Sequence, residues 1–389
     1  MKILVVQNPK SATEFENYFF NVFPIAEVRI LTSKNTIRCF NNMSDNCSVC
    51  YGPEYESTKF VEFLFNQTTL FRPDIIFSNS EVDVLRASVA RDLIGIKGQT
   101  VKEATAFRDK VAMKKLFSRM SLAAPRFSEV SCLSDIISFL NQNRKIVLKP
   151  RMGSGSQGVF VLDDIQKAVS LLRGNSELLS EVSHGQYMVE EFVVGDVYHV
   201  DVIVSQHQMV LFSPSKYFHP PHTFNEFNVG SYMLDETCPD YLALQALLTA
   251  SLPKAQLCDG IYHFEFFKSP SSTHFIAGEV GSRIGGGLIK DSISASFGVN
   301  PLKMLIDVLT GQPVEWVQRT SLSGWLLNTA MTKDWQDVKY DTAALNVTSL
   351  KTHRFDAQPS ASSVTCEQKL LFSYERTQTL QSAIEEFLC

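Results

Sequence analysis

A stretch rich in glycine and serine, over residues 149–159, has the composition of a loop that binds phosphate groups. It reads Lys-Pro-Arg-Met-Gly-Ser-Gly-Ser-Gln-Gly-Val. Glycines allow backbone N–H groups to come close to an anion, serine hydroxyls add donors, and the leading lysine supplies a positive charge. The simpler alternative is an ordinary hairpin turn, because short motifs also occur by chance.

The flanking sequence distinguishes this stretch from other glycine-rich phosphate loops. Apolar runs at 146–148 and 159–162 suggest a strand, a flexible tip and a second strand. A dinucleotide-binding Gly-x-Gly-x-x-Gly would instead open a helix, and a P-loop would place Lys-Ser or Lys-Thr after its last glycine. A protein-kinase loop has its lysine downstream, and the chain lacks the His-Arg-Asp and Asp-Phe-Gly motifs of kinases.

A pair of glutamates lies on two further apolar runs. Glu265 is in the run 263–267 and Glu279 is in the run 274–280, with a turn-forming Ser-Pro-Ser-Ser between them. If the runs pair as a hairpin, both carboxylates can fall on one face, where they would repel each other unless a cation lay between them. The pair therefore predicts a Mg²⁺ site beside bound phosphates, with two solvent-exposed glutamates as the alternative.

Strand-type runs alternate with helical patterns over the first hundred residues. Runs at 2–6, 28–31 and 73–78 read as strands, and residues 12–20 and 81–93 have helical patterns. This alternation predicts a small α/β domain with a parallel sheet. A ligand of this domain would lie at the carboxyl ends of the strands, near 7–9 and 78–80, although turn chemistry explains those polar residues equally well.

The remainder of the chain mixes helices and strands. Helical patterns cover residues 101–120, 133–140, 164–172 and 176–182, and β-rich runs cover 187–194 and 198–204. From about residue 312 the composition changes, with strand-type runs at 325–327 and 345–350 and a helical pattern over 380–388. These last patterns predict a small α+β segment that packs on the rest of the protein.

Composition and charge restrict the class of protein. The chain has 389 residues, enough for two or three domains, and a net charge of −5, which argues against a nucleic-acid partner. No membrane span is evident, and the apolar run at 3–6 is too short for a signal peptide, so we expect a cytoplasmic protein. Cys47 and Cys50 alone have ligand spacing, in surroundings that indicate a loop, and this is weak support for any chemistry.

The order of these motifs resembles that of the ATP-grasp superfamily. Along the chain come Arg-Asp-Lys at 108–110, the glycine loop, Val-Glu-Glu-Phe-Val-Val-Gly at 189–195, His-Phe-Glu at 263–265, and Glu-Val-Gly-Ser-Arg-Ile-Gly-Gly-Gly at 279–287. Each motif is weak alone, but their conjunction in this order over residues 1–312 is specific. Within the superfamily the chain looks most like the carboxylate-amine ligases that join amino acids into dipeptides.

The resemblance implies a fold and its divisions. It suggests an N-terminal Rossmann-like parallel α/β domain over 1–100 and an ATP-grasp fold of two α+β subdomains. The smaller subdomain would cover 101–185 and the larger 186–312, with a C-terminal α+β segment over 313–389.

The resemblance also implies roles by motif position. The residues implied to bind ATP are Lys110, Lys149, Gly153, Ser154, Gly155, Ser156, Gly158, Val159, Glu190, Glu191, Phe192, Val193 and Asp196. The two lysines would contact the α- and β-phosphates. Backbone groups of Glu191 and Val193 would pair with the adenine edge, and the Glu190 carboxylate would accept from its amino group. A core strand with exposed glutamates is the alternative for this last run.

Further residues are implied to act on the metal and the substrates. Glu265 and Glu279 would hold Mg²⁺, with Mn²⁺ as a second suitable ion. Arg283 would stabilise the acyl-phosphate and the oxyanion, and Lys216, from a lid segment at 216–222, would reach the γ-phosphate. The residues implied near the substrates are Tyr217, His199, Gly286 and Gly287. An ordinary structural histidine and a surface arginine are the alternatives for His199 and Arg283.

The sequence departs from the family pattern at two positions. Gly195-Asp196-Val197 replaces the usual Gly-x-Glu, whose glutamate binds the ribose, and whether Asp196 substitutes for it is open. Glu279-Val-Gly281 replaces the usual Glu-x-Asn, which removes one metal ligand, but related dipeptide ligases share this version.

The implied activity is ATP-dependent formation of an amide or peptide bond between a small carboxylate and a small amine. It would pass through an acyl-phosphate and release ADP and phosphate. Two alternatives stay open: another ATP-grasp reaction, such as phosphorylation or carboxylation of a small acid, and a non-catalytic ATP-binding regulatory protein. The resemblance suggests a homodimer, and the sequence does not specify the substrates.

Overall fold

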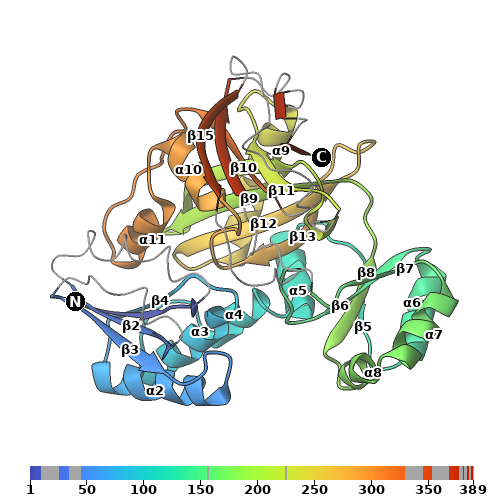
Figure 1. The fold of residues 1–389 in the computed structure, drawn as a ribbon, viewed down its shortest axis with the longest axis horizontal. Helices are drawn as coiled ribbons and strands as arrows, with labels where there is room; N and C mark the ends of the chain where they lie inside the picture. Colours follow the sequence, from blue (N-terminus) through green and yellow to red (C-terminus); the bar gives the residue numbers. More distant parts are fainter. Residues whose placement is uncertain are drawn as a thin grey trace.

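The computed structural model describes most of the chain in three sheets and their covering helices (Figure 1). The described residues are 1–9, 26–34, 45–155, 157–223, 226–328, 345–352, 368–375, 380, 383–384 and 387–388. The helix expected at 12–20 and the loop residue Ser156 lie outside these ranges.

The first sheet is parallel, with the strand order β3-β2-β1-β4. Its elements are β1 (Lys2–Val6), β2 (Glu27–Ser33), β3 (Cys47–Gly52), α2 (Thr58–Phe71), β4 (Ile75–Ser78) and α3 (Asp83–Ile94). Alternate residues of β1 point to opposite faces: Leu4 and Val6 join the core with α2 and α3, while Ile3 and Val5 join the core of the large sheet. The expected parallel α/β domain is thus confirmed, with both faces of its sheet covered.

The Cys47–Cys50 pair is on an edge strand, so the prediction of a loop there was wrong. Val49 and Tyr51 alternate with the polar positions of β3, and the strand pairs in parallel with β2. Residues three apart on a strand point to opposite faces, so the two thiols do not converge on one ligand. Burial raises the pKa of Cys47 to about 11, which keeps this thiol protonated at neutral pH.

The single helix predicted over 101–120 is two helices, α4 (Val101–Ala106) and α5 (Lys110–Met120). The break falls at the Arg-Asp of the motif, because the Asp109 side chain accepts hydrogen bonds from the N–H groups of Val111 and Ala112. Such a cap starts a new helix. Lys110 therefore becomes the first residue of α5 and lies at the start of a helix packed against the large sheet.

The second sheet is antiparallel, with the order β5-β8-β6-β7. Its elements are β5 (Phe127–Glu129), α6 (Leu133–Gln142), β6 (Ile146–Pro150), β7 (Phe160–Leu162), α7 (Ile165–Gly174), α8 (Ser176–Ser183) and β8 (Tyr187–Glu191). The pairing of β6 with β7 confirms the strand-loop-strand prediction for the glycine-rich stretch. In Figure 1 this unit lies to one side of the molecule, with α6 and α7 on its outer face.

Alternation along β6 and β8 separates a core face from an open face. Ile146, Leu148 and Val189 pack with the three helices, whereas Lys149 and Glu190 point the other way, toward the rest of the protein. The sequence pattern of these strands thus directs the lysine and the glutamate into the same cleft.

The third sheet is antiparallel and has eight strands, in the order β13-β12-β9-β10-β11-β14-β16-β15. Its strands are β9 (Asp196–Ser205), β10 (Gln208–Tyr217), β11 (Val229–Met233), β12 (Gly260–Lys268), β13 (Ile276–Gly281), β14 (Leu322–Leu327), β15 (Leu345–Thr352) and β16 (Gln368–Tyr374). The helices that cover it are α5, α9 (Pro239–Ala255), α10 (Ile289–Phe297) and α11 (Pro301–Leu309). The strands near the carboxyl end of the chain therefore extend the same sheet that begins with β9.

The two faces of β9 and β12 have different compositions. Even-numbered residues such as Val200 and Phe264 are packed against α5 and α9. Odd-numbered residues on the other face include His199, Asp201 and Glu265. The antiparallel sheets and the parallel N-terminal sheet together confirm the expected fold class.

Near the carboxyl end, the described positions 380, 383–384 and 387–388 are helical and buried. Their spacing of three and four residues matches the helical pattern read from the sequence over this stretch. Among the described helices, none combines the length and hydrophobicity needed to cross a membrane.

Candidate functional site

A cleft of about 350 Å³ lies between the second and third sheets. The glycine loop, β8 and the segment after it, and the paired strands β12 and β13 all contribute to its lining. The predicted site residues that line it are Lys110, Lys149, Gly153, Ser154, Gly155, Val159, Glu190, Glu191, Phe192, Val193, Glu265 and Glu279. Residues far apart in sequence therefore meet around one space of the size that small ligands occupy.

The tip of the β6–β7 hairpin depends on two glycines with left-handed backbone. Gly155 has φ +63° and Gly158 has φ +68°. A Cβ at Gly158 would lie 2.8 Å from the Tyr187 hydroxyl and 3.0 Å from Pro150 Cγ, whereas a Cβ at Gly155 would meet nothing within 4 Å. Gly158 thus fixes the base of the loop, and Gly155 leaves its tip open.

Two of the predicted cations, Lys110 and Lys149, reach the cleft from different elements. The Lys110 Nζ donates to the Gly153 carbonyl at 2.8 Å and to Glu279 Oε1 at 3.1 Å, which links the glycine loop to β13. Lys149 forms an ion pair with Glu190. Both lysines are almost fully buried, so each charge is held in place by a carboxylate.

Lys114 is a third buried lysine that the sequence reading did not single out. Its Nζ lies 3.1 Å from Glu190 Oε2 and donates to the Gly278 carbonyl at 2.8 Å. Burial lowers the pKa of Lys114, and the Glu190 charge opposes that effect. Because Glu190 is held between Lys114 and Lys149, its carboxylate is already neutralised on both oxygens where it faces the cleft.

The segment after β8 forms one wall of the cleft. Glu191 lines the cleft, and its carboxylate lies 3.1 Å from Arg126 Nε. Val193 lies beyond the end of β8, so its backbone groups are outside the sheet ladder. Phe192, Val197 and Phe267 add apolar surface, which suits a flat heterocycle.

Glu265 and Glu279 are register partners on β12 and β13, as the hairpin prediction required. Both side chains line the cleft and keep 27 % and 35 % of their surface exposed. Burial would raise the pKa of Glu279, but Lys110 and Lys149 outweigh it and lower that pKa to about 2. Two ionised oxygen ligands facing a phosphate-sized space fit a hard cation such as Mg²⁺.

Arg283 is held by a residue of the N-terminal domain. Glu81, just after β4, forms ion pairs with both Arg283 and Arg108, and Arg108 NH2 donates to the Met152 carbonyl at 2.8 Å. Asn79 is close to the same segment, with its Oδ1 3.4 Å from the Ile284 nitrogen. Glu81 therefore links the end of β4 to Arg283, a contact that no local sequence signal specifies.

Gly281 lies beside the ion pair of Glu81 and Arg283. A Cβ there would lie 3.4 Å from Glu81 Oε2 and 3.5 Å from Arg283 Cγ, which are ordinary van der Waals distances. The departure from the family pattern at Gly281 thus falls next to Glu81 and Arg283, without a steric requirement for glycine.

Lys216 and Asp196, predicted for different parts of ATP, contact each other. The Lys216 Nζ lies 2.6 Å from Asp196 Oδ2, between β10 and the start of β9. Neither residue lines the cleft directly, whereas Pro220, Pro221 and His222 of the predicted lid segment do. Nucleotide contacts by Lys216 or Asp196 would therefore require this pair to open.

The four residues predicted near the substrates have different surroundings. Tyr217 is buried, with its hydroxyl 3.5 Å from Glu265 Oε1. His199 is buried with both ring nitrogens engaged, by Asp201 at 2.9 Å and by Ser231 at 2.8 Å, so a direct substrate contact would break one of these bonds. Gly286 has open space where a Cβ would be, and Gly287, at φ +63°, packs against Trp325.

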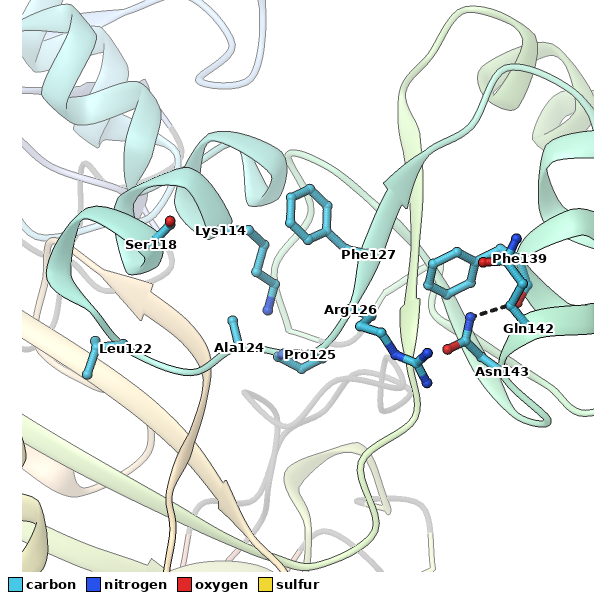
Figure 2. A pocket seen from close by; sticks show the side chains of 10 residues that line it. All are labelled: Lys114, Ser118, Leu122, Ala124, Pro125, Arg126, Phe127, Phe139, Gln142 and Asn143. Carbon is cyan, nitrogen blue, oxygen red and sulfur yellow. Dashed lines mark hydrogen bonds between the residues drawn. The ribbon is translucent and has the colours of Figure 1, made fainter.

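A second, shallower cleft of about 520 Å³ is lined by α5, the segment that leads into β5, and the end of α6 (Figure 2). Its residues are Lys114, Ser118, Leu122, Ala124, Pro125, Arg126, Phe127, Phe139, Gln142 and Asn143. Its two cations, Lys114 and Arg126, are the partners of Glu190 and Glu191. The second cleft is therefore lined by residues that hold Glu190 and Glu191 of the first cleft in place.

Comparisons with known proteins agree with this geometry. A family model described as an ATP-grasp domain matches residues 142–291. Among characterised proteins, an L-arginine-specific L-amino acid ligase of Bacillus subtilis is 26% identical over 253 residues, covering 62% of this chain and 60% of the relative. An alanine–anticapsin ligase of Bacillus subtilis is 24% identical over 144 residues, covering 35% of this chain and 30% of the relative. The matches thus span less than two thirds of either relative.

Solved structures resemble the whole chain. An L-amino acid ligase from Bacillus licheniformis superposes with a TM-score of 0.73 at 16% identity, covering 99% of this chain and 96% of that one. N5-carboxyaminoimidazole synthetase from Staphylococcus aureus, complexed with ADP, also has a TM-score of 0.73, at 11% identity, covering 99% of this chain and 96% of that one. At these identities the likeness shows the fold.

Proposed function

We propose that the protein is an ATP-dependent carboxylate-amine ligase that joins small molecules, most simply two amino acids; the ATP-grasp match over residues 142–291 supports this proposal. The observation that carries the proposal is the single cleft in which the glycine loop, two buried lysines and two facing glutamates come together. The sequence similarity to an L-amino acid ligase supports the choice of reaction.

In this proposal ATP binds with its base against the apolar wall and its phosphates at the glycine loop. Main-chain groups of Glu191 and Val193 pair with the adenine edge, and Lys110 and Lys149 neutralise the phosphates. Glu190 keeps Lys149 in position, since Lys114 balances its remaining charge. Lys110 and Lys149 need little rearrangement when the nucleotide binds, because ion pairs with Glu279 and Glu190 already hold them at the cleft.

The first chemical step activates the carboxylate. One of its oxygens attacks the γ-phosphorus, the bond from that phosphorus to the β–γ bridging oxygen breaks, and ADP leaves. The products of this step are an acyl-phosphate and ADP. Glu265 and Glu279 would hold Mg²⁺ beside the phosphates, and that ion would supply charge neutralisation during the transfer.

The second step forms the amide. The amine nitrogen attacks the acyl carbon, the carbon–oxygen bond to phosphate breaks, and the nitrogen loses a proton to solvent. Arg283, fixed by Glu81, stabilises the oxyanion and the departing phosphate. An amine that enters the site already deprotonated needs no dedicated base from the protein.

A second candidate reaction is carboxylation, because the ADP-bound N5-carboxyaminoimidazole synthetase has the same TM-score as the ligase. Both reactions activate a carboxylate-like oxygen with ATP, so they share the first step. They differ in the acceptor and in whether bicarbonate is consumed.

The test is release of phosphate from Mg²⁺-ATP with amino acids added singly and in pairs, followed by mass spectrometry of the products. The ligase proposal expects release that requires a pair and yields a new amide mass. Release that requires bicarbonate and no second amino acid would replace it with carboxylation. Release without an amide or a carboxylated product would indicate a kinase.

A further inference from the structure

A buried network lies behind Glu265, on the same face of the third sheet. His199 and Asp201 of β9 are register partners of Glu265 and His263 of β12, respectively. Because residues two apart on a strand share a face, all four side chains point the same way. The sheet thus places an aspartate and two histidines directly beside one of the proposed metal ligands.

Asp201 is the centre of this network. It is fully buried, and it accepts three hydrogen bonds: from His199 Nδ1 at 2.9 Å, His263 Nδ1 at 3.0 Å and the Gly285 N–H at 3.0 Å. An ionised carboxylate only accepts, so both imidazoles must present Nδ1–H to it. This fixes the tautomer and the ring orientation of each histidine.

The fixed orientation of His263 points its other nitrogen at the cleft. Its Nε2 lies 3.5 Å from Glu265 Oε1, which also lies 3.5 Å from the Tyr217 hydroxyl. His263 is therefore a bridge between a carboxylate in the core and a carboxylate at the cleft. Partners of this kind orient metal ligands in known metalloproteins, and their loss weakens metal binding.

Gly285 ties the same network to the glycines after Arg283. A Cβ at Gly285 would lie 2.6 Å from His263 Nδ1 and 2.4 Å from Ile289 Cδ1, so the ring of His263 occupies the space of a side chain. The Gly285 N–H bond to Asp201 then holds the backbone at this closest approach. The Asp201 carboxylate thus contacts both β12, the strand that carries Glu265, and the loop that follows Arg283.

His199, Asp201 and His263 also have the donor set of a transition-metal site, with ligand atoms within 4.8 Å of one another. Their present geometry is that of hydrogen bonds, however. Both Nδ1 atoms face Asp201, and His199 Nε2 faces Ser231 at 2.8 Å. A metal at this place would have to replace bonds that already satisfy each group.

We infer that Asp201 is a positioning residue for the metal site, acting through His263 on Glu265 and through the Gly285 N–H on the segment after Arg283. The inference rests on the proposed function, because it takes Glu265 as a metal ligand. It assigns Asp201 no contact with substrate or nucleotide.

The test measures Mn²⁺ binding to the full chain in the presence of ADP, by electron paramagnetic resonance of the free ion, without turnover. Asp201→Asn keeps the shape of the side chain but removes its charge and one acceptor. We expect a Mn²⁺ dissociation constant about tenfold higher than that of the unchanged protein. The matched control is Asp240→Asn, which breaks an ion pair with Lys268 at the other end of β12 and should leave Mn²⁺ affinity unchanged.

One replacement of His263, alone and combined with Asp201→Asn, tests the path through this ring. His263→Asn retains an amide near the Nδ1 position, toward Asp201, and loses the group that faces Glu265, so it should weaken Mn²⁺ binding. With His263→Asn in place, adding Asp201→Asn should cause little further loss of Mn²⁺ affinity, because Asp201 reaches Glu265 through His263, whereas its bond with the Gly285 N–H acts on the segment after Arg283. Should Asp201→Asn fail to fold, Gly285→Ala, which displaces the His263 ring, should produce the same weakening.

A folded Asp201→Asn protein that binds Mn²⁺ as the unchanged protein does would overturn the inference. Additive losses of Mn²⁺ affinity in the double variant would overturn the path from Asp201 through His263 to Glu265, since they would show that Asp201 affects Mn²⁺ binding without His263. If the unchanged protein bound ADP but no Mn²⁺, the metal site of the proposed function would itself be wrong, a result distinct from failure of the Asp201 variants alone.

Discussion

Glu265 and Glu279 face each other across β12 and β13, and each has a different nitrogen-bearing side chain beside it. Lys110 contacts Glu279 at 3.1 Å, and the His263 ring lies 3.5 Å from Glu265. Like charges at directly opposed positions destabilise a sheet, so their retention here calls for compensation. A bound Mg²⁺ would supply positive charge beside the two carboxylates.

The first prediction concerns this pair. Glu279→Gln removes a charge without changing shape, and we expect it to lower the rate of phosphate release by at least about 100-fold while the thermal midpoint is retained. Steady-state rates at saturating Mg²⁺ and circular dichroism on heating are the measurements. Glu177→Gln, at an exposed glutamate of α8, is the control. A Glu279→Gln enzyme of normal rate would remove Glu279 from the site.

The second prediction concerns Lys114. Lys114→Met leaves the buried Glu190 with one cationic partner, so we expect a loss of unfolding free energy on the order of 3 kcal/mol. ADP affinity should fall as well, because Glu190 would draw Lys149 away from the phosphates. Urea unfolding and calorimetric ADP titration measure the two effects. Lys115→Met, at the exposed neighbour on the same helix, should change neither.

The third prediction concerns pH. Burial would raise the pKa of Glu81, but Arg283 and Arg108 outweigh it and lower that pKa below its ordinary value. A carboxyl whose folded pKa is lowered contributes stability above its unfolded pKa, and this contribution is lost as pH falls through the folded value. Glu81→Gln should therefore show a weaker decline of thermal midpoint between about pH 5 and pH 3. An identical decline in both proteins would contradict the ion-pair account of Glu81.

The fourth prediction concerns ribose recognition. If Asp196 takes the role of the missing glutamate, it must leave Lys216 and accept from a ribose hydroxyl. Asp196→Ala should then abolish any preference for ATP over 2′-deoxyATP, measured as the ratio of kcat/KM for the two nucleotides. A preference that survives the change would show that another group binds the ribose.

The fifth prediction compares two loop glycines. Gly155→Ala should lower stability by about 1 kcal/mol, the cost of a left-handed backbone at a residue with a Cβ. Gly158→Ala adds contacts of 2.8 Å with Tyr187 and 3.0 Å with Pro150, so its loss of stability and of ADP affinity should be larger. Thermal midpoints and ADP titrations of both variants check the order.

Strand alternation explains what the sequence predicted well. In the middle of β12, His263 and Glu265 alternate with apolar Tyr262, Phe264 and Phe266, so the side of Glu265 and its pairing with Glu279 followed from local pattern. The same holds for the hairpin of the glycine loop. The break before α5 had a local signal too, because Asp109 is a good helix cap, but the run of helical residues around it masked the signal.

The residues that hold the site residues in place had no such signal in the local sequence. Glu81 meets Arg283 across 202 positions of sequence, and Lys114 meets Gly278 across 164. Asp201 shares a face of β9 with His199, but the pattern of this strand does not indicate that Asp201 meets His263 and the Gly285 N–H. Such contacts depend on how the sheets are placed in space, which no window of the sequence encodes.

The most direct test of the central proposal follows one oxygen atom. A substrate carboxylate labelled with ¹⁸O is supplied with Mg²⁺-ATP and the amine, and the released phosphate is examined by mass spectrometry. Activation through an acyl-phosphate predicts that one labelled oxygen passes from the carboxylate to phosphate for each amide formed. Amide formation with unlabelled phosphate would contradict the proposed activation of the carboxylate.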